Sequence, residues 1–249
     1  PLSVTQSQTD VSCGNACDGT ASVVVAGGTP DYTFLWTPAP ATGQGTASAT
    51  GICAGPVSLL ITDANGCTLT VPFTIDPAVP IQLSLQLTPA SCPTDCDGTA
   101  GVIVSGGLAP YGYVWDPAPG AGQGNPTATG LCPQTYSLTV SDAVGCDTTI
   151  SFTITAPPPI VPNATATNVT CAGGCNGTIL LVPSGGVGAY TYNGIPVPPI
   201  GQGTANVAGL CAGDWSVTIG AGACDTTITI TITEPPPMTV DLSTTDVSC

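Results

Sequence analysis

The sequence predicts an all-β chain of three tandem antiparallel sandwich repeats held together by disulfides. Three observations carry this prediction: four cysteines recur at a fixed spacing, apolar residues follow a β periodicity, and turn-forming residues are abundant. The 249 residues include Gly 32 and Pro 26, a composition that makes turns frequent and disfavours long helices.

The charge balance excludes whole classes of function. The chain has 15 acidic side chains and no lysine, arginine or histidine, so its formal net charge is −15. Without a cation, binding to nucleic acid or to an anionic membrane surface has no electrostatic source. Without histidine or lysine, the usual activated nucleophiles, imidazole metal sites and Schiff bases cannot be assembled. We therefore predict no enzyme, no cofactor, no nucleic-acid partner and no insertion into a membrane.

The cysteines reveal an internal repeat. Equivalent cysteines lie about 79 residues apart, and Gly43-Gln44-Gly45 recurs at the same spacing as Gly122-Gln123-Gly124 and Gly201-Gln202-Gly203. Proline clusters separate the copies, and because proline fixes φ we expect short, stiff junctions. The predicted domains are repeat 1 (residues 1–79), repeat 2 (80–158), repeat 3 (159–236) and the start of a fourth repeat (237–249).

Within one repeat the periodicity is that of β-strands. Residues 20–25 and 57–62 are short apolar or alternating runs, and residues 226–233 alternate threonine with isoleucine. Asn65-Gly66 lies between two such runs and fits a two-residue hairpin turn. Six or seven strands in about 79 residues, with a turn every 8–12 residues, predict an immunoglobulin-like sandwich.

Several recurring motifs resemble a known family, the SprB-type repeat of very large surface adhesins of Bacteroidota, including those used in gliding motility. The similarity rests on Val11-Ser12-Cys13, Asp18-Gly19, the run Gly27 to Tyr32, Trp36, and the run Thr62 to Cys67, with the closing prolines. It covers all three copies and implies a secreted, surface-displayed, non-enzymatic array. The second and third cysteines of each copy depart from the family pattern, in which cysteines of the first and last motifs are usual.

All thirteen cysteines are candidates for disulfides. Four per copy in a small secreted domain favour two bridges each, and the competing interpretation is a four-sulfur zinc site. A repeat of this size buries a limited core, so each bridge is expected to add about 2–4 kcal/mol. The candidates are Cys13, Cys17, Cys53, Cys67, Cys92, Cys96, Cys132, Cys146, Cys171, Cys175, Cys211, Cys224 and Cys249.

Loop positions leave two pairing schemes open. In an immunoglobulin-like strand order, the first-to-second and fifth-to-sixth strand loops lie at the same end, which brings Cys17 or Cys13 near Cys53. Cys67 follows the last hairpin, which belongs to the opposite end. We favour the scheme that closes each copy on itself, with Cys17–Cys53 and Cys13–Cys67. The other scheme bridges consecutive copies through Cys67–Cys92, Cys146–Cys171 and Cys224–Cys249.

Carboxylates and aromatic side chains are further candidate sites. Asp18, Asp97, Asp63 and Asp142 recur beside turns, and we expect them to hydrogen-bond their own loops, with calcium binding as the alternative. Aromatic residues near the third strand are expected to fill the core, with a sugar-stacking face as the alternative. They are Tyr32, Trp36, Tyr111, Tyr113, Trp115, Tyr190 and Tyr192.

Short motifs also predict glycosylation. Asp147-Thr148-Thr149 and Asp225-Thr226-Thr227 match the Asp-Ser/Thr-hydrophobic or Thr signal for O-glycans in Bacteroidota, so Thr148 and Thr226 are candidate sites.

Together these features predict an extracellular structural and adhesive repeat protein that forms a rigid stalk or filament at the cell surface. The alternative is a glycan- or calcium-binding adhesion module. Expected partners are other copies of the chain, through end-to-end assembly or pairing of edge strands, and surface glycans. The start of a fourth repeat at Pro237 is a candidate for completing a neighbouring chain.

Overall fold

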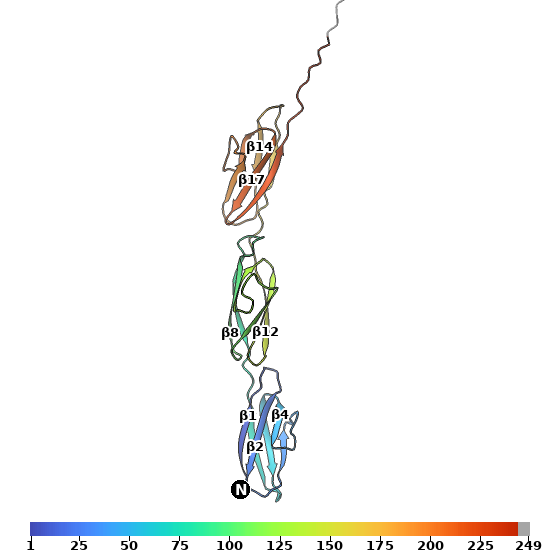
Figure 1. Ribbon diagram of the computed structural model, residues 1–249, viewed down its shortest axis with the longest axis vertical. Helices are drawn as coiled ribbons and strands as arrows, with labels where there is room; N and C mark the ends of the chain where they lie inside the picture. The colour runs from blue at the N-terminus through green and yellow to red at the C-terminus, as the bar shows by residue number, and fades with distance from the viewer. Residues whose placement is uncertain (244–249) are drawn as a thin grey trace, which may run out of the picture. The chain divides into compact units, whose positions relative to one another are not determined.

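The computed structural model describes residues 1–243 and shows an all-β chain (Figure 1). Its strands form six three-stranded sheets, two for each repeat. Short apolar runs separated by glycine- and proline-rich turns account for this all-β structure. Across residues 1–243 no helix is long and apolar enough to cross a bilayer.

The first repeat has the strand order of an immunoglobulin-like sandwich. Its first, second and fourth strands form one sheet, its third, fifth and sixth strands form the other, and all neighbouring strands run antiparallel. The predicted fold class is therefore confirmed. The strands are β1 (Ser3–Thr9), β2 (Gly19–Ala26) and β4 (Ser48–Ile52) in one sheet, and β3 (Thr33–Thr37), β5 (Gly55–Thr62) and β6 (Thr68–Ile75) in the other.

The other two repeats use the same order. In the second repeat one sheet contains β7 (Gln82–Thr88), β8 (Gly98–Ser105) and β10 (Thr127–Leu131). The other contains β9 (Gly112–Asp116), β11 (Thr135–Ser141) and β12 (Asp147–Thr153). In the third repeat one sheet contains β13 (Ala164–Thr167), β14 (Gly177–Leu181) and β16 (Asn206–Leu210). The other contains β15 (Tyr190–Ile195), β17 (Gly213–Ala221) and β18 (Cys224–Ile232).

The core of the first repeat lies between its two sheets. Alternate residues of β5 are buried, and the Trp36 ring packs 5.4 Å from the ring of Phe73, centroid to centroid. The side chain of Gln44 holds β3 in place, because its Oε1 accepts the Trp36 amide at 3.0 Å and its Nε2 donates to the Trp36 carbonyl at 3.2 Å. The recurring Gly-Gln-Gly motif is thus a clamp on the third strand.

The two ends of a repeat differ in the loops that they carry. Gly19 pairs with Ile52, and Gly55 pairs with Ile75, so the β1–β2 loop, the β4–β5 loop and the end of β6 share one end. The chain therefore leaves the first repeat at the end that carries Cys13, Cys17 and Cys53. The β5–β6 hairpin turn, with Cys67, lies at the other end, beside the start of β1.

The described chain forms two compact units. The first consists of Pro1–Leu87, Ala100–Thr129 and Thr135–Phe152, and the second of Thr88–Thr99, Gly130–Gln134 and the residues from Thr153 onward. The division runs through the second repeat. The sequence-based boundaries at residues 79, 158 and 236 accordingly stay predictions.

Candidate functional site

Ten cysteines form five disulfides of two kinds. Three lie within a repeat, where they join the β1–β2-type loop to the β4–β5-type loop: Cys17–Cys53, Cys96–Cys132 and Cys175–Cys211. Two others, which we call the junction disulfides, join consecutive repeats: Cys13–Cys146 and Cys92–Cys224. Each junction disulfide links the first cysteine of one repeat to the fourth cysteine of the next.

This pairing corrects both sequence-based schemes. The Cys17–Cys53 bond is the expected one, but Cys13 is bonded to Cys146 instead of Cys67, and Cys92 is bonded to Cys224. The reason is strand direction: a chain that leaves a repeat at its β1–β2 loop end meets the hairpin end of the next repeat. The direction of the bridge between copies is therefore the reverse of the second scheme.

Three of the thirteen cysteines are not among the ten that form these five disulfides. Cys67 and Cys171 are exposed free thiols, and Cys249 lies outside the described residues. For all three, participation in a disulfide stays a prediction.

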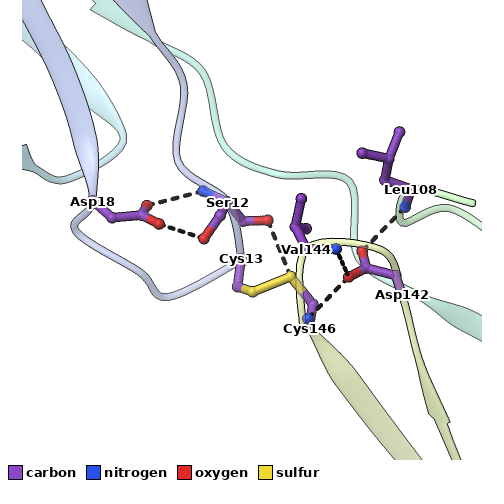
Figure 2. Close-up of a disulfide and its surroundings, with 7 residues drawn as sticks. All are labelled: Ser12, Cys13, Asp18, Leu108, Asp142, Val144 and Cys146. Carbon is purple, nitrogen blue, oxygen red and sulfur yellow. Dashed lines mark hydrogen bonds between the residues drawn. A yellow bond between two sulfur atoms is a disulfide. The ribbon is translucent and has the colours of Figure 1, made fainter. Parts of the chain in front are cut away.

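The first half of the junction is a loop held by Asp18. The Ser12 amide donates to Asp18 Oδ1 at 2.9 Å, and the Ser12 hydroxyl donates to Oδ2, which fixes the loop just before Cys13 (Figure 2). The Ser12 hydroxyl and then its backbone amide lower the pKa of the Asp18 carboxyl, because both stabilise its charged form.

The second half of the junction is a hairpin turn held by Asp142. Its Oδ1 accepts the amides of Cys146 (2.9 Å) and Val144 (3.0 Å), and its Oδ2 accepts the Leu108 amide at 3.1 Å (Figure 2). Burial by itself raises the pKa of Asp142, but the backbone amides of Leu108, Cys146, Val144 and Gly145 outweigh it, so the pKa lies below its usual value. Asp63 holds the corresponding turn of the first repeat.

These contacts confirm that the recurring aspartates hydrogen-bond their own loops. Both oxygens of Asp18, Asp63 and Asp142 accept donors from the protein itself. In the part of the chain that the structure describes, no group of three or more His, Cys, Asp or Glu side chains could hold a metal ion.

The sulfur atoms of the junction lie close to backbone. Cys146 Sγ is 3.0 Å from the Ser12 carbonyl oxygen, and Cys224 Sγ is 3.1 Å from the Ser91 carbonyl oxygen. These are close S···O contacts, since a disulfide sulfur carries no hydrogen to donate. An open groove of about 320 Å³ lies beside the first junction, between residues 13–16, the linker 78–81 and residues 145–148.

The candidate glycosylation sites lie beside the junctions. Thr148 lines the groove next to Cys146, and Thr226 lines a smaller groove of about 180 Å³ next to Cys92 and Cys224. Both threonines are partly buried, on β12 and β18 respectively. O-glycosylation at these positions stays a prediction.

The aromatic candidates serve the core and its turns. Trp36 and Trp115 are buried, and the five tyrosines are partly buried. Three tyrosine hydroxyls also donate to backbone carbonyls of the Gly-Gly turns, a role that sequence reasoning missed although the five-residue spacing recurs in every copy. These bonds run from Tyr32 to Gly27, from Tyr111 to Gly106 and from Tyr190 to Gly185.

Several solved structures are similar to the chain. Similar solved structures include the three N-terminal domains of the bacteriophage RB49 highly immunogenic outer capsid protein (16% identity, covering 92% of this chain and 95% of that chain, TM-score 0.42). Titin domains I67–I69 (11% identity, 95% and 99%, TM-score 0.39) and domains 1–6 of the surface layer protein SbsC (15%, 94% and 40%, TM-score 0.30) are also similar. No curated protein sequence matches the chain.

A family model described as the SprB repeat matches three segments: residues 5–41, 84–120 and 163–194. Each segment starts within or just before the first strand of a repeat, includes its second strand and extends into or past its third. The segments follow one another at the spacing of the cysteines. Each of the three copies therefore contains a segment that is similar to the SprB repeat.

Proposed function

We propose that this chain is an extracellular, non-enzymatic stalk or filament segment that carries tension at a cell surface and so serves adhesion. The observation that supports it is the pair of junction disulfides, which add a second covalent link between consecutive repeats. Disulfides persist in oxidising compartments, which agrees with an extracellular location. The chain also offers no lysine or arginine to trypsin-like proteases.

The disulfides create a covalent route that is far shorter than the backbone. It runs, in order, through Cys13, Cys146, Cys132, Cys96, Cys92 and Cys224. This route uses only residues 132–146 and 92–96, about 20 residues that reach about 70 Å when fully extended. The backbone from Cys13 to Cys224 has about 210 residues and would reach about 700 Å.

This route limits how far a pulled chain can lengthen. Most of it is the segment from Cys132 to Cys146, which already contains the extended strand β11. A repeat without such links would release all of its residues when it unfolds under force. Here the remaining strands lie off the route, so tension reaches them only through packing and hydrogen bonds, and an array of such repeats would resist stretching even if one core opened.

Single-molecule pulling of the full chain from its two ends tests this function. With disulfides intact, we expect no unfolding steps and a final contour length of about 200 Å, set by the short route and the chain ends. After reduction, we expect three steps of about 270 Å each.

The matched control replaces only the junction cysteines, as Cys13→Ser, Cys146→Ser, Cys92→Ser and Cys224→Ser. This variant keeps the three disulfides within repeats, so each repeat should extend by about 150 Å without any reductant. Steps of this size in the oxidised parent, or identical traces for parent and variant, would overturn the proposed role.

Adhesion through a bound glycan or calcium is the alternative function of the same array. A glycan array and a calcium titration of the melting temperature test it. Specific glycan hits, or a melting temperature that rises with calcium, would favour recognition over a purely mechanical role.

A further inference from the structure

Two free thiols occupy the positions that form junction disulfides elsewhere in the chain. Cys171 is the first cysteine of the third repeat, equivalent to Cys13 and Cys92. Cys67 is the fourth cysteine of the first repeat, equivalent to Cys146 and Cys224. Cys171, in the third repeat, and Cys67, in the first, are thus the two complementary halves of a junction.

The loop that carries Cys171 has the same backbone-amide hydrogen bond as its two disulfide-bonded equivalents. The Thr170 amide donates to Asn176 Oδ1 at 3.1 Å, and Asn176 Nδ2 donates to Thr170 Oγ1 at 2.8 Å. Asn176 therefore does for this loop what Asp18 does before Cys13. The thiol is presented in the arrangement that forms a bond in the first repeat.

The turn that carries Cys67 is prepared in the same way. Asp63 Oδ1 accepts the amides of Cys67 (2.8 Å) and Asn65 (3.0 Å), and Asp63 Oδ2 accepts the Thr29 amide at 3.0 Å. Asp142 makes the equivalent three bonds in the turn before the bonded Cys146.

Cys67 and Cys171 are both more exposed than the cysteines of the second junction disulfide. Cys92 and Cys224 are 7% and 8% exposed at their junction, whereas Cys67 and Cys171 are exposed. Beside Cys171 is an open groove of about 380 Å³ lined by residues 170–172, Pro235, Pro236 and Met238. It is the counterpart of the groove at the first junction, where the linker 78–81 faces the hairpin of the next repeat. Met238 is 94% exposed, whereas Ile81, the residue at its position in the first linker, is 6% exposed.

We propose that Cys171 of one chain forms a disulfide with Cys67 of a second copy, so that copies join end to end through a junction like the two within the chain. The contact is heterologous: the loop at one end meets the hairpin turn at the other, and such contacts extend into open series instead of closing into dimers. The inference builds on the proposed function, but its test measures cross-linking and not tension, so either can fail alone.

The bond forms by thiol–disulfide exchange with a small disulfide oxidant such as oxidised glutathione. The Cys67 thiolate attacks one glutathione sulfur, which forms a mixed disulfide and releases one reduced glutathione. The Cys171 thiolate of the other chain then attacks the Cys67 sulfur and releases the second. Two thiols become one disulfide, and the two electrons and two protons leave on two molecules of reduced glutathione.

Two complementary single variants test the pairing in the 249-residue chain, with Cys249→Ser as a background. Cys67→Ser retains only Cys171 as a free thiol, and Cys171→Ser retains only Cys67. In a glutathione redox buffer, each variant alone should stay monomeric on a non-reducing gel. Their equimolar mixture should give a discrete dimer, at least about tenfold more abundant than in either variant alone. The background protein with both thiols should give a ladder of dimers and longer oligomers.

Mass spectrometry identifies the bond and checks the fold. Each variant should first show the mass of five intact disulfides, and pepsin digestion of the dimer should release a peptide pair that contains Cys67 and Cys171. Dimers of either variant alone would mean that like thiols pair, which overturns the proposal. A correctly folded mixture that yields only monomers with attached glutathione would overturn it as well.

Discussion

The Asp142 carboxylate and the Cys146 amide are joined by a hydrogen bond of 2.9 Å that fixes the turn beside the first junction disulfide. The third repeat has Ala221 at the position of Asp142, in a turn one residue shorter, and Cys224 still forms its disulfide with Cys92. The Asp142 carboxylate therefore orders the turn, but a junction disulfide does not require a carboxylate at this position.

Replacing Asp142 by alanine should lower the melting temperature by a few degrees while the Cys13–Cys146 disulfide still forms. The cause is the loss of the acceptor for the Cys146, Val144 and Leu108 amides. Differential scanning calorimetry gives the first result and peptide mapping the second. Asp116→Ala, at an exposed position, controls for the loss of a charge, and equal melting temperatures for the two variants would contradict the prediction.

Stability should be constant from neutral pH down to about pH 5 and should fall as the pH drops below about 4. The pKa values of Asp18, Asp63 and Asp142 lie below the usual value of 3.8 in the folded chain. The unfolded chain thus binds protons first as the pH falls, so the stabilisation present above pH 4 is lost as the pH passes through the lowered folded values. Guanidinium unfolding between pH 2 and pH 7 measures this profile. A profile that rises below pH 4 would show the opposite sign.

Gly106→Ala should destabilise the second repeat by about 2–4 kcal/mol, since the position has both strain and a steric clash. Its φ is +71°, and a Cβ there would lie 2.1 Å from the Pro80 carbonyl oxygen. Gly124→Ala is the matched control, because Gly124 also has a positive φ (+82°) but nothing lies within 4 Å of its Cβ position. Urea unfolding of both variants separates the effect of the clash from that of the backbone strain. Equal losses of unfolding free energy in the two variants would show that no clash exists.

Removing one disulfide within a repeat, as Cys17→Ser with Cys53→Ser, should cost about 3–4 kcal/mol. The bond closes a loop with a sequence separation of 36 residues, and its loss increases the entropy of the unfolded chain. Cys67→Ser, at an exposed free thiol, should change the stability by less than about 0.5 kcal/mol. Chemical unfolding measured without reductant compares them, and similar values for the two variants would be the contrary result.

Much of the fold could be predicted from the sequence, because its signals are local and repeated. The cysteine spacing gave the three copies, and alternation in residues such as Val57, Leu59 and Ile61 gave the strands. Asn65-Gly66 gave the place of a turn, but the turn spans residues 63–67 instead of the expected two residues. The clamp between Gln44 and the Trp36 backbone could not be predicted, because a glutamine in a glycine-rich loop has no sequence signal that identifies its partner.

The direction of the junction disulfides could have been predicted but was not. The placement of Cys17 beside Cys53 and of Cys67 at the opposite end was correct. The last strand runs back to the end that carries Cys13, so the chain leaves the repeat there. This direction pairs the first cysteine of one copy with the fourth cysteine of the next.

The two junction disulfides overlap along the sequence, since Cys92 precedes Cys146. Any single peptide bond between Cys13 and Cys224 is consequently enclosed by at least one of these rings. A protease that cuts one surface loop would therefore leave the two fragments joined by a disulfide. The chain would separate into two pieces only after cuts at more than one site.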